Sequence, residues 1–147
     1  MEMKESDNLP QWVERLSVFS QALAKLTDVI GLSKHHTLND YERDSLVKRF
    51  EFTYEMAWKL MMSYEKDCGV SQIVGSRDVV RHATTLSLVD NGEAWLDMID
   101  ARNQTSHLYD EEAVADVIDD IIHTYYQLFI ELQHQMNDIK LRFTCTD

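Results

Sequence analysis

Apolar residues recur at intervals of three and four along most of the chain, a spacing that gathers them on one side of an α-helix. The first helix is predicted over residues 12–30, after Pro10, and Gly31 suits its C-terminal cap. Its stripe consists of Trp12, Leu16, Phe19, Leu23, Leu26 and Ile30.

A second helix is predicted from residue 40 to about residue 68, with Gly69 suited to the turn that follows it. Asn39 and Glu42 are spaced as in a capping box, in which each side chain bonds the backbone N–H of the other residue. One apolar stripe of this helix contains Leu46, Phe50, either Tyr54 or Ala57, and Met61, while Phe52, Met56 and Trp58 lie off it. A helix that is apolar on several faces has several neighbours, so it is either central in a bundle or also contacts a second subunit.

Two shorter helices are predicted next. Ser76 can cap one that runs to about Leu86, with Asp78 in its first turn. Asn91 begins another, which carries four residues toward the interior or a shared cleft. These are Trp95, Met98, Ile99 and Arg102.

The last helix is predicted to span most of the domain, from about Val114 to Ile139, with the acids Asp110, Glu111 and Glu112 at its N-terminus, where they suit the helix dipole. Only four glycines and one proline occur in 147 residues, too few for the turns of a β-sandwich. The sequence therefore predicts an all-α, antiparallel bundle of four to five helices. We expect one domain over residues 1–147, with residues 1–10 as a flexible N-terminus.

The net charge of −12 disfavours general binding to a nucleic-acid backbone, which requires many basic side chains. Cys68 and Cys145 are far apart in the sequence and are expected to remain thiols. The polar N-terminus does not resemble a signal peptide, and no apolar run approaches the roughly 20 residues that cross a bilayer. We therefore expect a cytoplasmic protein without a membrane segment.

The candidate chemistry is concentrated between residues 95 and 110. Arg102, His107 and Tyr109 place a guanidinium, an imidazole and a phenol within eight residues, a set that can bind a phosphate and move a proton. Residues five apart on a helix point about 140° away from each other. For Arg102 and His107 to converge, the helix must end or distort near Ser106, or the site must form across a dimer.

Structural roles would also explain these residues. His107 could interact with a helix C-terminus, and Tyr109 could pack against Val114 as a hydrophobic staple. Arg102 could form an ion pair with one of three acids, namely Asp97, Asp100 or Glu51.

Other clusters favour structural interpretations. The pair His35 and His36 is typical of a solvated loop, because no metal-binding spacing accompanies it. Four aromatic residues on the second helix could stack bases, but core packing or a dimer seam suits their helical spacing better. They are Phe50, Phe52, Tyr54 and Trp58. Acids near the start of the last helix need no metal, and we expect no metal and no cofactor. They are Asp116, Asp119 and Asp120.

Three segments in this order resemble the nucleotidyltransferase substrate-binding subunit family, a member of the HEPN superfamily of helical bundles. They are Arg43–Lys59 (RDSLVKRFEFTYEMAWK), Gly75–Arg81 (GSRDVVR) and Trp95–Glu111 (WLDMIDARNQTSHLYDE). The chain departs from many relatives at Leu86–Val89, where a glycine is expected before an aliphatic pair. That departure concerns a turn and leaves the polar motif intact.

The resemblance implies a homodimer that acts with a cognate minimal nucleotidyltransferase. It further implies a metal-independent ribonuclease toxin with an Arg-x4-6-His motif, which the transferase silences by adding AMP to a motif tyrosine. Carried over by position, Arg102 and His107 are the catalytic candidates and Tyr109 is the candidate for modification. Asn103 and Glu51 are candidates for binding or support.

We therefore expect a HEPN-type toxin whose substrate would be RNA. The alternative is a non-catalytic subunit that presents substrate to the transferase, and a purely structural helical adaptor is a third hypothesis. The negative net charge favours a protein or small-molecule partner over long RNA. The intact Arg102 and His107 favour catalysis.

Overall fold

The computed structural model describes residues 9–107 and 110–145. These residues form helices joined by short connections and contain no strand. The helices are α1 (Gln11–Ser33), α2 (Asp40–Asp67), α3 (Gly75–Thr85), α4 (Gly92–Gln104), α5 (Glu111–Asp120) and α6 (Tyr126–Cys145). No helix in the described part of the chain is long and apolar enough to span a membrane.

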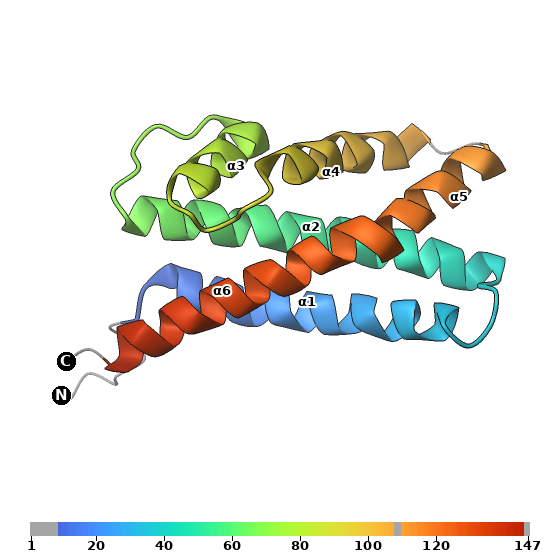
Figure 1. Cartoon of the computed structure of the whole chain (residues 1–147), viewed down its shortest axis with the longest axis horizontal. Coiled ribbons are helices and arrows are strands. Elements are labelled where there is room, and N and C mark those ends of the chain that lie inside the picture. The colour runs from blue at the N-terminus through green and yellow to red at the C-terminus, as the bar shows by residue number, and fades with distance from the viewer. Residues whose placement is uncertain (1–8, 108–109, 146–147) are drawn as a thin grey trace.

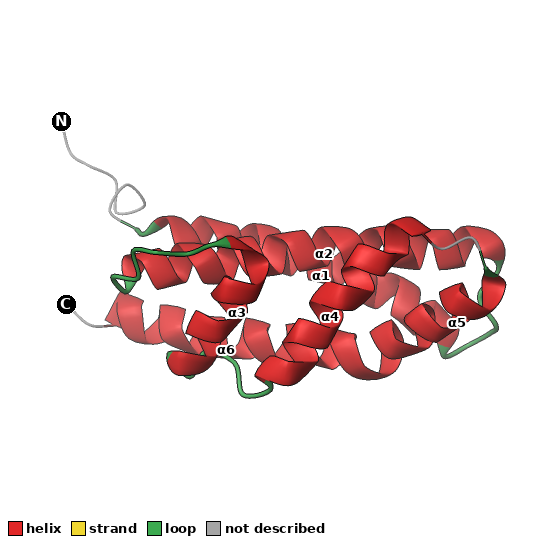
Figure 2. Cartoon of the chain, turned by 90° about the horizontal axis from the view of Figure 1, so that it is seen from above, coloured by secondary structure: helices red, strands yellow, loops and turns green. Residues whose placement is uncertain are grey.

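The long helices α1 and α2 run antiparallel, side by side (Figure 1). The rod formed by α5 and α6 crosses them diagonally, and the shorter α3 and α4 lie beside α2 (Figures 1 and 2). Counted with α5 and α6 as one rod, the described chain contains five helical segments. This confirms the expected all-α bundle.

Phe129 of α6 joins the helices at the centre of the core. Its ring lies 6.1 Å from the ring of Phe19 in α1, 6.1 Å from Phe50 in α2 and 5.9 Å from Trp95 in α4. All four side chains are at most 2% exposed. Because buried aromatic rings contribute large apolar areas, this cluster holds α4 against the three long helical segments.

The ends of α2 agree with the prediction. The Asn39 side chain accepts a hydrogen bond from the Glu42 N–H, and Glu42 accepts from the Asn39 N–H, which completes the capping box. Gly69 follows the helix at a φ of 96°, in the left-handed region that glycine adopts readily.

Two predicted caps were wrong. Gly31 lies inside α1, which continues for one more half-turn and is capped at Lys34. Ser76 lies inside α3, and the Asp78 carboxylate instead accepts a hydrogen bond from the N–H of Val74, the residue before the helix. An acid in the first turn can bond a free N–H as a capping serine does, so the local sequence did not distinguish the two arrangements.

The long C-terminal helix is interrupted by one π-helical turn at Ile121–Tyr125. Ile121 is fully buried in this turn, and Tyr125 stacks on Phe50 with ring centroids 5.9 Å apart. The apolar spacing of three and four continues through the turn, so the hydrophobic pattern did not indicate it. The extra residue of a π turn is therefore a product of packing against α2 and α4.

Candidate functional site

Arg102 lies in the last turn of α4, about one turn after the buried residues Met98 and Ile99. Its Nη1 lies 3.0 Å from the Oε2 of Glu51, in the middle of α2. Both side chains are 27% exposed, so the ion pair lies at the edge of the packed interior. Of the three acids considered for Arg102 from the sequence, Glu51 is the partner.

Thr105 completes this contact, although the sequence analysis did not select it. Its hydroxyl oxygen lies 3.3 Å from Arg102 Nη1, 3.2 Å from Glu51 Oε2 and 2.7 Å from the Arg102 carbonyl oxygen. The hydroxyl has one proton, so it donates either to the carboxylate or to the carbonyl while its oxygen accepts from the guanidinium. These bonds hold the arginine head group in one orientation.

The guanidinium retains bonding capacity. Its Nε atom is buried and has no hydrogen-bond partner among the described residues. A buried donor without a partner costs free energy, and a ligand oxygen that reached it would remove that cost. The Arg102 guanidinium is thus held through Nη1 by Glu51, whereas its Nε–H still lacks an acceptor among the described residues.

A second arginine lies near this site. Arg77 of α3 forms an ion pair with Asp100, so Asp100 does not pair with Arg102. Burial raises the pKa of the Tyr54 hydroxyl, and the charges of Arg102 and Arg77 partly offset this rise. The positive charges of α3 and α4 therefore both act on the Tyr54 hydroxyl of α2. Only tertiary contact relates these positions, which are distant in the sequence.

The remaining motif residues are placed only in part. Helix α4 ends at Gln104, and Thr105–His107 form a short 3-10 turn, so the helix changes where convergence of Arg102 and His107 would require it. Asn103 is exposed beside Arg102. The side chain of His107 and the whole of Tyr109 lie outside the described residues. The structure therefore joins Arg102 to Glu51 and leaves the two other motif positions as predictions.

The other sequence candidates have structural surroundings. Phe50 and Tyr54 belong to the core and Trp58 is half-buried, whereas Phe52 is 53% exposed, so the four rings do not form one stacking surface. His36 contacts Glu42 at 3.0 Å, beside the start of α2. Among the described residues, no three His, Cys, Asp or Glu side chains are arranged to hold a metal ion.

The described helices define an all-α bundle with an ion-paired arginine, Arg102, in the last turn of a short helix. The chain itself belongs to the family described as "Nucleotidyltransferase substrate binding protein like", which matches residues 14–138. The resemblance drawn from the three motifs is confirmed.

The chain is 34% identical over 83 residues to "Probable ribonuclease HepT" of Haemophilus influenzae, a match that spans 52% of this chain and 57% of that relative. The chain thus spans little more than half the length of that curated protein.

Two solved structures share the fold. A Haemophilus influenzae protein, described as revealing the fold of a nucleotidyltransferase substrate-binding domain, is similar with a TM-score of 0.74 at 24% identity. The match covers 83% of this chain and 98% of that protein's chain. The tri-AMPylated HEPN toxin of Shewanella oneidensis, in complex with an MNT antitoxin, is similar with a TM-score of 0.66 at 14% identity. That match covers 86% of this chain and 96% of the toxin.

Proposed function

We propose that this chain is the HEPN-type toxin subunit of a toxin–antitoxin pair, with metal-independent ribonuclease activity, and that its partner is a minimal nucleotidyltransferase. The observation that carries the proposal is the Arg102 guanidinium, held by Glu51 and Thr105 where α4 gives way to a 3-10 turn, within an intact Arg-x4-His-x-Tyr segment. Membership of the family and the names of its relatives support it.

In the proposed reaction, His107 takes the proton of an RNA 2′-hydroxyl, and the resulting oxygen attacks the adjacent phosphorus. The bond to the 5′-oxygen of the next nucleotide breaks, and that oxygen takes a proton from water as it leaves, while His107 later returns its proton to the solvent. The products are a 2′,3′-cyclic phosphate and a 5′-hydroxyl end. Arg102 stabilises the negative charge that develops on the phosphate oxygens, and its unpaired Nε–H is a donor for this role.

A homodimer is part of the proposal. Two copies of the Arg-x4-His segment facing one another would form a shared cleft. The second copy would bring its own arginine and histidine to the RNA, beside those of the first. Dimerisation is tested by the mass in solution, which should be twice the 17.2 kDa of the chain.

The deciding experiment is cleavage of total cellular RNA in excess EDTA by the purified chain. Arg102→Ala and His107→Ala should each reduce cleavage by at least about a hundredfold, because each removes a group that acts in the transition state. The matched controls are Arg81→Ala and His134→Ala, which alter an exposed arginine on α3 and an exposed histidine on α6. These variants should cleave as the wild type does.

The alternative function is a non-catalytic subunit that presents substrate to the transferase. The ion pair of Arg102 with Glu51 favours it, because the pair also gives the arginine a structural role. If the unmodified wild type, purified as a dimer without AMP, cleaves no RNA, the ribonuclease proposal fails. Binding of a transferase by that inactive dimer would then support the alternative.

A further inference from the structure

The paired helices α1 and α2 form one side of the molecule, and Figure 2 shows no helix of the described chain beyond them. A hollow of about 270 Å³ lies between these two helices, and we call it the α1–α2 hollow. Its lining residues are Ala22, Lys25, Lys48, Arg49 and Phe52. Three of them, Lys25, Lys48 and Phe52, are exposed, so the hollow opens to solvent. The proposed ribonuclease chemistry uses none of these residues.

Phe52 presents an aromatic ring that the core does not use. Its side chain is 53% exposed, whereas Phe50, two residues earlier, is fully buried. Residues two apart on a helix point about 160° away from each other, so Phe52 faces outward where Phe50 faces the core. Ala22 of α1 is the small residue on the other wall and leaves room beside the ring. The ring can therefore receive a planar group from solution.

The charged side chains around the ring are all positive. Lys25, Lys48 and Arg49 line the hollow with it, and no acid does. None of the three cations forms an ion pair with a residue that the structure describes. Arg49 Nη1 donates to the Lys25 carbonyl oxygen at 2.6 Å, which holds the guanidinium across the two helices and engages only one of its five N–H donors. The hollow therefore attracts an anion, although the chain carries a net charge of −12.

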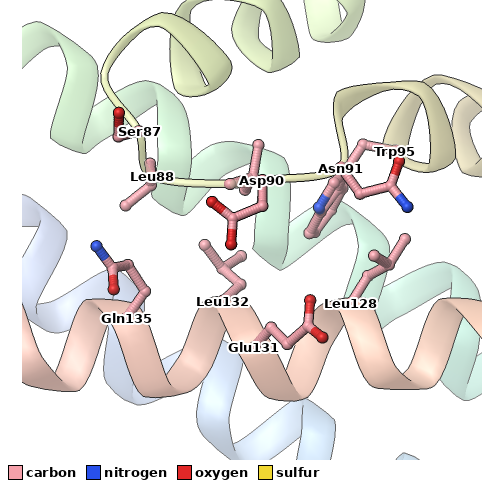
Figure 3. Close-up of a pocket in the computed structure, with 10 residues that line it drawn as sticks. Ser87, Leu88, Asp90, Asn91, Trp95, Leu128, Glu131, Leu132 and Gln135 are labelled. Atoms are coloured by element: carbon pink, nitrogen blue, oxygen red, sulfur yellow. The ribbon is translucent and has the colours of Figure 1, made fainter.

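The hollow between the α3–α4 connection and α6 has the opposite character (Figure 3). Its volume is about 180 Å³, its charged lining residues are Asp90 and Glu131, and no lysine or arginine lines it. These carboxylates repel a phosphate group. A positive lining thus distinguishes the α1–α2 hollow from this one.

The α1–α2 hollow lies around α2 from the candidate active site. Glu51, which pairs with Arg102, and Phe52 are adjacent in α2, and on an ideal helix their side chains point about 100° apart. Lys48, three residues before Glu51, points between these two directions. An RNA strand at Arg102 can therefore continue around α2, past Lys48, to the ring of Phe52.

We propose that the α1–α2 hollow binds single-stranded RNA outside the cleavage site, with one base stacked on Phe52 and neighbouring phosphates paired with Lys25, Lys48 and Arg49. Proteins that bind single strands without sequence preference combine a basic groove with aromatic rings in this way. Pockets for drug-sized molecules occupy roughly 300–1,000 Å³, so this smaller hollow suits one ring system. The inference rests on the proposed function, because it takes RNA as the ligand.

The test measures binding of a fluorescein-labelled 2′-O-methyl RNA of about twelve nucleotides, a length within the range of single-strand binding sites. The methyl groups remove the attacking hydroxyl, so binding is observed without cleavage. Fluorescence anisotropy is recorded at salt concentrations from about 50 mM upward. Neutralising three phosphates of a single strand should give a slope of about −2 in a plot of log binding constant against log salt concentration.

The stacking and the charge contacts are tested by separate variants. Phe52→Ala should weaken binding about tenfold and leave the salt slope unchanged, because it removes stacking but no charge. Lys25→Gln combined with Lys48→Gln should also weaken binding, and it should reduce the steepness of the slope by about 1.4. A purely structural role of these side chains would not separate affinity from salt slope in this way.

Matched controls lie outside the hollow. Tyr41→Ala removes an aromatic side chain on α2 that is 87% exposed. Lys34→Gln combined with Lys66→Gln removes two exposed lysines and changes the charge by the same amount as the double variant of the hollow. Both controls should bind the oligonucleotide as the wild type does.

Cleavage of total RNA by the same proteins separates this inference from the proposed function. A wild type that binds with the expected variant effects but does not cleave supports the hollow and contradicts the ribonuclease. Cleavage by the wild type, with unchanged oligonucleotide binding by both hollow variants, overturns the hollow alone. The inference also fails if the wild type does not bind at about 0.1 mM protein, the weak end of non-specific nucleic-acid binding. If Phe52→Ala instead halves the mass in solution without changing RNA binding, the hollow belongs to a contact with a second copy of the chain.

Discussion

Glu51 of α2 and Arg102 of α4 are 51 residues apart in the sequence, and their side chains meet at 3.0 Å. The contact fixes the end of α4 on the middle of the long helix. It also sets the direction in which the candidate catalytic arginine points. The pair therefore links the stability of the bundle to the geometry of the proposed active site.

Glu51→Gln should lower the free energy of unfolding by about 1 kcal/mol, since it removes a half-buried charged partner but keeps an acceptor for Thr105. A double-mutant cycle with Arg102→Met, measured by urea denaturation, should give a coupling energy of about 0.5–1 kcal/mol. Asp44→Asn, an exposed acid on α2, is the control. Fully additive losses would mean that the ion pair does not stabilise the fold.

Tyr109 is the predicted acceptor of AMP. Co-expression with the cognate minimal nucleotidyltransferase should add one or more units of roughly 329 Da to the chain, each of which carries a negative charge. The modified protein should cleave RNA more slowly. Tyr109→Phe should lose the adduct at that position in peptide mass spectra, whereas Tyr41→Phe, which alters a tyrosine that is 87% exposed, should retain it. An unchanged adduct on Tyr109→Phe would exclude this assignment.

Glu65 makes stability depend on pH. Its carboxyl is fully buried and has no hydrogen-bond partner in the part of the chain that the structure describes. Burial, followed by the charge of Asp78, raises its pKa from 4.5 to about 8. The folded protein keeps this proton between pH 4.5 and 8, whereas the unfolded chain releases it. Stability should therefore fall as the pH rises through that window, by at most about 1.4 kcal/mol per pH unit.

Glu65→Gln removes this titration while it preserves the shape of the side chain. Urea denaturation at several pH values should give a flatter curve between pH 4.5 and 8 for the variant than for the wild type. The variant should be the more stable protein at the alkaline end of the window. Parallel curves for the two proteins would show that Glu65 titrates normally in the fold.

Ser87 has a φ of 59°, in the left-handed backbone region that residues other than glycine rarely adopt. The N–H groups of Ser87 and Leu88 bond the carbonyls of Thr84 and Ala83, which gives the turn that closes many helices at a glycine. Ser87→Gly should raise the free energy of unfolding by about 0.5–1 kcal/mol, because it relieves the backbone strain.

Ser17→Gly is the matched comparison for Ser87→Gly. Ser17 is exposed in the middle of α1, where glycine should instead lower the free energy of unfolding by about 0.5 kcal/mol. Thermal denaturation of both variants distinguishes the two effects. A loss of stability in Ser87→Gly would contradict the strain assigned to this turn.

The sequence by itself determined the helices, most of their ends and the family. Apolar spacing is a property of the local chain, and so is the capping box of Asn39 and Glu42, so both could be recognised without coordinates. The Leu86–Val89 segment also showed where a glycine is missing, and Ser87 occupies the position at which the backbone needs one.

Only the tertiary structure decided which distant residues meet. The spacing of residues allowed three partners for Arg102, and packing of α4 on α2 selected Glu51. The π turn at Ile121–Tyr125 and the unpaired carboxyl of Glu65 likewise depend on contacts between helices. Such features arise from side chains that approach one another through space, and the periodicity of a single helix contains no information about the neighbour that it packs against.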